Sequence, residues 1–181
     1  MDSLKNRPRL ATVWLGGCSG CHMSFLDLDE RLIELHRRAE LCASPFTDYK
    51  DFPEVDITLV EGAVTTVEQL EEIRRIRERT KILVSFGDCA VTGNVTAMRN
   101  FFSVEDVLDR AYRETATQIV GIPAGNPAVP RLLERVRPVH EVVKVDYFLQ
   151  GCAPTAEEIY RLLIDLLDGR TPQLAGRKFG S

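Results

Sequence analysis

The segment KILVSFGDC, residues 81–89, decides the fold, because it joins the clearest strand of the chain to a cysteine. Residues 81–86 are mainly apolar, which is typical of a short strand buried on both faces of a parallel sheet. Gly87 and Asp88 then end the run, and Cys89 follows directly. The segment therefore predicts a buried strand with a cysteine just beyond its carboxyl end.

Three other cysteines follow predicted strands in the same way. Residues 10–15 form a buried strand that is followed by Cys18 and Cys21, and residues 142–149 form the last strand, which is followed by Cys152. The carboxyl ends of parallel strands meet at one edge of a sheet. We therefore expect these thiols to lie close together, although they are far apart in the sequence.

The remaining elements alternate between strand and helix. Apolar residues three and four positions apart predict amphipathic helices, and Ser or Thr caps mark where helices begin. Two more strands are expected at residues 56–60 and 117–122, with a loop at residues 123–130. Helices are expected over residues 23–38, after a cap at Thr65 or Thr66, from Ser103 to about residue 115, and from a cap at Thr155 to residue 167.

This alternation predicts the α/β class, with a doubly wound, mostly parallel sheet that carries helices on both faces. The chain has 181 residues, of which 44% are hydrophobic, and it shows no internal repeat or linker. We therefore expect one domain over residues 1–181. In such folds ligands bind beyond the carboxyl ends of the strands, at the point where the strand order reverses.

The charge balance and the apolar runs narrow the class of protein. The 23 basic and 27 acidic residues give a net charge of −4, which argues against nucleic-acid binding. No apolar run approaches the roughly 20 residues that a membrane span needs, and the N-terminus lacks the pattern of a signal peptide. We therefore expect a cytoplasmic protein, in which five cysteines favour metal binding or catalysis over disulfides.

Four thiols at one edge are compatible with several kinds of site. The segment CSGCH at residues 18–22 matches the c-type haem pattern, and its cysteines also resemble a thioredoxin-like redox pair. Neither site gives a role to Cys89 and Cys152. A zinc site usually takes four thiolates from two close pairs, whereas an iron–sulfur cluster accepts scattered thiolates and gives the site a redox purpose. We therefore favour a cluster.

The residues around the cysteines agree with this choice. Gly17, Gly20 and Gly151 directly precede three of the four cysteines, and glycine lets the backbone approach a bulky inorganic ligand. Cys42 has no neighbouring glycine and follows no predicted strand, so we interpret it as a structural core residue. A cluster-bearing chain of this size should also present an exposed apolar patch to a partner.

Four segments, WLGGCSGCHMS (14–24), VEGAV (60–64), GDCAVTGN (87–94) and GCAPTAEEI (151–159), occur in the order found in small subunits of nickel–iron hydrogenases. The chain resembles that family over most of its length. The resemblance implies one [4Fe-4S] cluster on Cys18, Cys21, Cys89 and Cys152, proximal to the nickel–iron site of a separate large subunit.

The resemblance also places Glu61 near the cluster. In that position Glu61 would tune the cluster, relay protons or bond across an interface, and the alternative is a helix-capping or solvated carboxylate. His22 is interpreted as an ordinary loop histidine and Trp14 as core packing beside the cluster loop.

Two departures narrow the subtype. The related quinone-reducing complex carries adjacent cysteines where this chain has the spaced C-S-G-C, and uptake hydrogenases carry further clusters after the position of Cys152. The chain therefore resembles the small subunit of the soluble, bidirectional NAD-reducing type. This implies diaphorase subunits with flavin and further clusters as additional partners, and no catalytic residue on this chain. A hydrogenase-like electron-transfer subunit linked to formate, ferredoxin or quinone stays open.

The fold expected from the sequence resembles flavodoxin, which raises the question of a bound flavin. The segment GGCSG at residues 16–20 is committed to the cluster, and no other segment matches a phosphate-binding loop. Binding of FMN by this chain therefore stays open.

Overall fold

The computed structural model describes the whole chain except residues 1–6, 49–50, 116, 118–120, 124–127 and 175–181. Its centre is a five-stranded sheet in which each hydrogen-bonded pair of strands is parallel. In spatial order the strands are β2 (Glu40–Ala43), β1 (Arg9–Trp14), β3 (Val55–Glu61), β5 (Thr80–Phe86) and β7 (Tyr147–Leu149).

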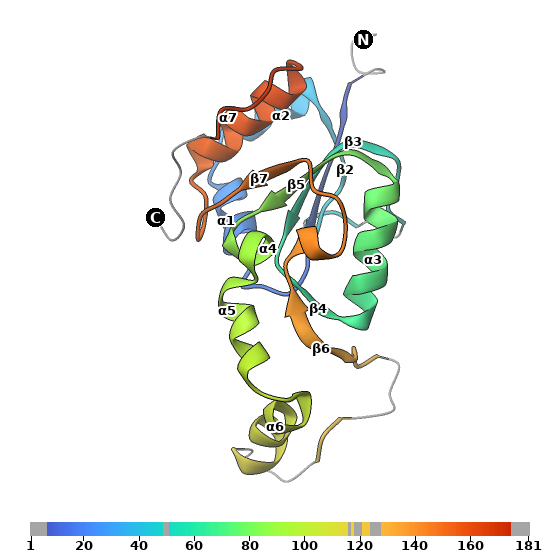
Figure 1. The fold of residues 1–181 in the computed structure, drawn as a ribbon. Helices are drawn as coiled ribbons and strands as arrows, with labels where there is room; N and C mark the ends of the chain where they lie inside the picture. Colours follow the sequence, from blue (N-terminus) through green and yellow to red (C-terminus); the bar gives the residue numbers. More distant parts are fainter. Residues whose placement is uncertain (1–6, 49–50, 116, 118–120, 124–127, 175–181) are drawn as a thin grey trace.

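Helices cover both faces of this sheet (Figure 1). One face carries α1 (Gly20–Leu26), α2 (Arg31–Arg38) and α7 (Ala156–Leu167). The other face carries α3 (Val67–Glu78), and α4 (Asp88–Thr92) follows β5. The predicted α/β class with a doubly wound sheet is thereby confirmed, and the strand order is that of flavodoxin-like folds.

Shorter elements complete the chain. An antiparallel pair is formed by β4 (Val64–Thr66) and β6 (Leu132–Arg137). Away from the sheet extend α5 (Asn94–Ala97), the 3-10 turn η1 (Met98–Phe101), α6 (Val104–Asp109) and the π-helical turn η2 (Arg110–Glu114). A second 3-10 turn, η3 (Val139–Glu141), precedes β7. Within the described residues, no helix combines the length and apolarity that a membrane span requires.

The buried side chains form a core on each face of the sheet. On the face that carries α1, α2 and α7, side chains of four strands pack against side chains of those helices. For example, Leu59 of β3 belongs to one cluster with Phe25 of α1 and Leu163 of α7. On the opposite face, Val60, Ile73 and Leu83 belong to a second cluster. Because the central strands are covered twice, they are nearly continuous apolar runs, which made them readable in the sequence.

The helix expected over residues 23–38 is instead two helices. The chain leaves α1 after Leu26 and begins α2 at Arg31, and Asp29 between them has a left-handed φ of 49°. Aspartate tolerates that conformation better than most residues. Short turns at the break keep Leu28 and Leu35 on the buried side, so the apolar spacing was correct although the helix is interrupted.

The strand expected over residues 142–149 is shorter than predicted. Only Tyr147–Leu149 pairs with β5, because Val142, Val143 and Val145 instead pack against the core of the α3 face. Of the strand expected at 117–122, residues 118–120 lie outside the described residues, and the described ones are not in a strand. The strands β2, β4 and β6 were missed, since each is short or partly exposed.

The expected caps are confirmed. The side chains of Thr66, Ser103 and Thr155 each accept a backbone N–H in the first turn of the helix that follows. Ser103 and Thr155 form capping boxes with Asp106 and Glu158. Thr155 thus begins the helix that follows the last cysteine loop.

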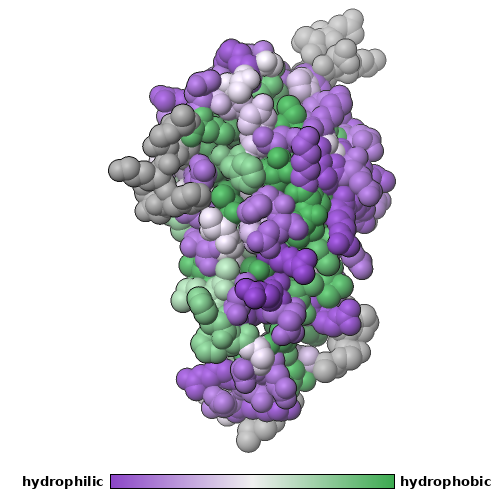
Figure 2. All heavy atoms as spheres, viewed as in Figure 1, coloured by the Kyte–Doolittle hydropathy of each residue, from purple (hydrophilic) through white to green (hydrophobic). Residues whose placement is uncertain are grey.

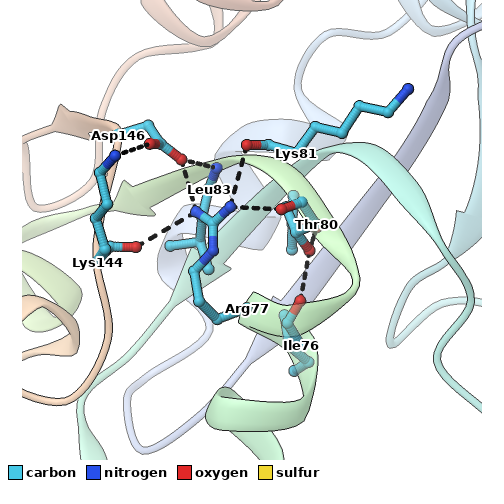
Figure 3. Close-up of polar contacts among 8 residues, drawn as sticks. Ile76, Arg77, Thr80, Lys81, Leu83, Lys144 and Asp146 are labelled. Atoms are coloured by element: carbon cyan, nitrogen blue, oxygen red, sulfur yellow. Dashed lines mark hydrogen bonds and ion pairs between the residues drawn. The ribbon is translucent and has the colours of Figure 1, made fainter.

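Hydrogen bonds and an ion pair centred on Arg77 and Asp146, called the Arg77–Asp146 clip below, hold the start of β7 against the sheet (Figure 3). The guanidinium of Arg77, at the end of α3, donates to the Asp146 carboxylate at 2.6 Å and to the carbonyls of Thr80 and Lys144. Asp146 also accepts the Leu83 amide at 2.8 Å. The clip therefore joins α3, β5 and the segment that leads into β7.

We predict that Arg77→Ala lowers the free energy of unfolding by about 2 kcal/mol at neutral pH, because several charge-assisted hydrogen bonds are lost from a half-buried site. Urea unfolding of the two proteins would measure the difference. The matched control is Arg74→Ala, on the exposed side of the same helix, which should change stability little. Equal losses for both variants would contradict a specific role for the clip.

The cost of Arg77→Ala should depend on pH. Burial alone raises the pKa of Asp146, but the Leu83 amide and the Arg77 guanidinium outweigh burial and hold that pKa below its ordinary value. A carboxyl with a lowered pKa stabilises the fold above the unfolded pKa, and the contribution is lost as pH falls through the folded pKa. The difference between wild type and Arg77→Ala should therefore shrink as pH falls below about 5 and through the lowered folded pKa of Asp146.

Candidate functional site

The ends of four strands are level across the sheet. Trp14 pairs with Glu61, Glu61 with Phe86, and Phe86 with Leu149. The strand order reverses between β1 and β3, which is where ligands bind in doubly wound folds. The loops that leave this row of residues form the candidate site.

All four predicted cysteines leave that row. Cys18 lies in the loop before α1, Cys21 in the first turn of α1, Cys89 in the first turn of α4, and Cys152 after β7. The structure brings the four cysteines to one edge of the sheet: a Cβ on Gly17, next to Cys18, would lie 4.0 Å from the Cβ of Cys89, and Asp88 and Gly151, which precede Cys89 and Cys152, are hydrogen-bonded. Cys21 is buried, Cys89 half-buried, and Cys18 and Cys152 are exposed.

Gly87 leaves room for these thiols. Its φ is 83°, and a Cβ at this position would lie 2.1 Å from the Sγ of Cys21. Its amide donates to the Leu149 carbonyl at 2.7 Å, so the backbone between β5 and α4 cannot shift freely. Sequence reasoning singled out the glycines that precede cysteines and missed this one, although its place directly after the buried strand was a usable signal.

Two hydrogen bonds between Asp88 and Gly151 join the loops that carry Cys89 and Cys152. The Asp88 carboxylate accepts the Gly151 amide at 2.7 Å, and the Asp88 amide donates to the Gly151 carbonyl at 3.0 Å. Asn94 at the start of α5 donates to the Sγ of Cys152 at 3.6 Å. Asp88 and Asn94 were not singled out from the sequence, because both are common loop and cap residues.

Glu61 is buried beside the cysteines, with 2% of its surface exposed. Its carboxylate accepts the amides of Cys21 at 3.2 Å and His22 at 2.9 Å, and it also bonds the Nδ1 of His22. The reading of Glu61 as a solvated carboxylate is therefore wrong, whereas the helix-capping geometry is observed. Whether Glu61 relays protons stays a prediction.

Two other readings of the sequence are corrected here. His22 was interpreted as a loop histidine, but it lies in α1 and is fully buried against the rings of Trp14, Phe46 and Phe86. Trp14 was expected in the core, but 45% of its surface is exposed. Trp14 is the last residue of β1 and the four residues before it are all buried, so its exposure comes from its place at the strand end.

The electrostatics of the site disfavour free thiolates. Burial, followed by the charges of Glu61 and the neighbouring thiols, raises the pKa of Cys21. Burial and the charges of Cys18 and Cys152 likewise raise the pKa of Cys89. Thiolates in such a group need positive charge between them, and a coordinated metal supplies it.

Cys42 lies apart from this group, on the edge strand β2. Its Sγ accepts from the Nε of Arg9 at 3.2 Å and donates to the Glu40 carbonyl. The thiol is half-buried rather than fully enclosed in the core. Its expected structural role agrees with these contacts.

The chain belongs to the family described as NADH ubiquinone oxidoreductase, 20 Kd subunit, whose model matches residues 18–166. It is similar to the delta subunit of the NAD-reducing hydrogenase HoxS of Cupriavidus necator, with 46% identity over 90% of this chain and 79% of the relative. It is also 37% identical to one subunit of the F420-non-reducing hydrogenase vhu of Methanocaldococcus jannaschii, over 92% of this chain and 58% of that protein.

Solved structures of hydrogenase chains are also similar to this chain. A chain of a NAD⁺-reducing [NiFe]-hydrogenase in the H2-reduced state matches with a TM-score of 0.90 and 44% identity, covering 94% of this chain and 97% of that one. A chain of the Ni-Fe-Se hydrogenase of Desulfomicrobium baculatum matches with a TM-score of 0.60 at 16% identity, which shows a shared fold alone. The resemblance to hydrogenase small subunits that the motifs indicated is confirmed.

We predict that Gly87→Ala disrupts the thiol group, because the new Cβ would overlap the Sγ of Cys21 and the backbone φ would add about 1–3 kcal/mol of strain. Iron per chain in the purified protein would measure the effect, and it should fall well below the wild-type value. Gly169→Ala is a matched control, because Gly169 also has a positive φ of 69° but nothing lies within 4 Å of its added Cβ. Unchanged iron in Gly87→Ala would contradict this account of the site.

Proposed function

We propose that this chain is the electron-transfer small subunit of a NAD-reducing [NiFe] hydrogenase. The observation that carries the proposal is the convergence of Cys18, Cys21, Cys89 and Cys152 at the carboxyl edge of the sheet, beyond the ends of β1, β5 and β7. It is supported by 46% identity to a subunit of a NAD-reducing hydrogenase over most of both chains. The chain itself would contribute no catalytic residue, because hydrogen would react on a separate large subunit.

The four thiols would hold one [4Fe-4S] cluster, which supplies one-electron transfer. The residues present fit such a group in number and kind of donor, and Gly87 leaves space where a side chain would collide with Cys21. Among the described residues, no three His, Cys, Asp or Glu side chains are arranged to hold a single metal ion. Thiolates on one zinc ion stand about 3.8 Å apart, whereas those on the corners of a cluster are spread wider.

The protein's own residues would fix and shield the site. The ties of Asp88 to Gly151 and of Glu61 to α1 hold the loops in place. The aromatic rings of Trp14, Phe46 and Phe86 surround His22 and exclude water from the inner side. Burial and hydrogen bonds of this kind are what a protein uses to set a cluster potential.

Exposed apolar surface supports a protein partner. Large apolar side chains are exposed on α5, η1 and the residue that follows, and Figure 2 shows apolar surface in this region. These residues are Val95, Met98, Phe101 and Phe102, with exposed fractions from 61% to 83%. Monomeric proteins seldom expose such groups together. We assign the large hydrogenase subunit, which would carry the nickel–iron site, as one partner.

The further partners would be diaphorase subunits that carry flavin and additional clusters and reduce NAD. The cytoplasmic location expected from the sequence and the single domain over residues 1–181 stay predictions. Whether this chain binds a flavin also stays open.

The second candidate function is a hydrogenase-like electron-transfer subunit of a complex with another electron acceptor. The 37% identity to a subunit of an F420-non-reducing hydrogenase favours it as the alternative.

We predict that Cys89→Ser lowers the iron content of the anaerobically purified complex and abolishes hydrogen-dependent NAD reduction. The loss of one thiolate would leave one iron of the proposed cluster without its protein ligand. Diaphorase activity with an artificial acceptor should survive, because it would reside in other subunits.

Cys42→Ser is the matched control for this experiment. It removes a half-buried thiol whose contacts are to Arg9 and Glu40, and it should keep both iron and hydrogen-dependent activity. Full activity of Cys89→Ser, or equal losses in the two variants, would contradict the assignment of the ligands.

A further inference from the structure

The first turn of α1 is capped from outside the helix. Ser19 stands at its N-cap position in a left-handed conformation, with φ of 65°, and its side chain makes no capping hydrogen bond. Helices normally satisfy their first amides through the side chain at that position. Here the amides of Cys21 and His22 donate to Glu61, which lies at the end of β3.

The same carboxylate also bonds the imidazole of His22. One oxygen, Oε2, faces both the amide and the Nδ1 of His22. Glu61 and His22 have exposed fractions of 2% and 0%. Because a carboxylate can only accept here, Nδ1 carries the proton and donates it. The other ring nitrogen, Nε2, has no hydrogen-bond partner within the described part of the chain.

Packing holds the imidazole in this orientation. The ring centroids of Trp14 and Phe46 each lie 5.6 Å from that of His22, and the centroid of Phe86 lies at 6.1 Å, all with edge-to-face geometry. A buried charge without partners is very costly, so three donors converging on one carboxylate indicate a built arrangement.

We infer that Glu61 and His22 form a positioning pair, which holds Cys21 in the first turn of α1 and sets the negative charge beside the cluster. Glu61 acts on the position of Cys21 through its amide, and His22 balances the carboxylate through Nδ1. The inference rests on the proposed function, because it concerns the same four-cysteine site. It assigns specific roles to two residues that take part in no ligand bond.

The two residues should shift the cluster potential in opposite directions. Glu61→Gln keeps one oxygen, which can take the place of Oε2 beside the His22 amide and Nδ1, and it removes the negative charge, which makes the cluster easier to reduce. His22→Phe keeps an aromatic ring among its neighbours and removes the Nδ1 donor, so the carboxylate charge is less balanced and reduction becomes harder. A role in packing alone would not produce shifts of opposite sign.

The test uses the complete complex, purified without oxygen, as wild type, Glu61→Gln, His22→Phe and the control Glu71→Gln. Glu71 is an exposed carboxylate on α3. Iron per complex is measured first and compared with wild type, and the midpoint potential of the cluster is then obtained from a redox titration followed by electron paramagnetic resonance. We expect the same iron content in all four complexes, a more positive potential for Glu61→Gln, a more negative one for His22→Phe and no shift for Glu71→Gln.

The outcomes separate this inference from the proposed function. A wild-type complex without iron and sulfide overturns the proposed function and the inference together. A wild-type cluster with unchanged potentials and spectra in both variants, or with shifts of the same sign, overturns the pair while the function stands. If Glu61→Gln loses its iron, the midpoint potential of the His22→Phe complex becomes the test. An unshifted potential in that variant overturns the inference.

Discussion

Parallel pairing of β1, β3, β5 and β7 at one level is the constraint on which the site depends. The row formed by Trp14, Glu61, Phe86 and Leu149 places four strand ends side by side. Each cysteine lies three or four residues beyond this row, or in the first helical turn after it. A shift of one residue in any pairing would turn that strand's side chains to the opposite face and displace its cysteine. Two buried cores, one on each face, oppose such a shift.

Short polar ties then fix what the sheet brings together. Asp88 joins the loops that follow β5 and β7, and Glu61 joins the end of β3 to the helix that follows β1. Farther from the cysteines, the Arg77–Asp146 clip fastens the start of the three-residue strand β7. Since so short a strand has few backbone hydrogen bonds of its own, side-chain ties of this kind are needed to hold its register.

The sequence was sufficient for the fold class and for the convergence of the cysteines. Strands buried on both faces are nearly continuous apolar runs, and a cysteine just beyond such a run has only one edge to occupy. The break between α1 and α2 was not predictable from apolar spacing, because the short turn around Asp29 preserves that spacing. The strands β2 and β6 were not predicted, because partly exposed segments that mix polar and apolar residues show no clear hydrophobic period.

Other parts of the site depend on contacts that no local pattern encodes. The role of Gly87 follows from the position of a thiol 66 residues earlier in the chain. The pairing of Glu61 with His22 spans 39 residues and is visible only after β1 and β3 are aligned. Motif resemblance pointed to Glu61, but its burial and its three donors came from the structure.

The most direct test of the central claim is metal and sulfide analysis of the anaerobically purified protein, joined with electron paramagnetic resonance of its reduced form. We expect four irons and four sulfides on this chain, a signal from one reduced [4Fe-4S] cluster, and nickel in a copurifying partner protein. Zinc without sulfide, or a metal-free chain with a titratable disulfide between Cys18 and Cys21, would contradict the claim.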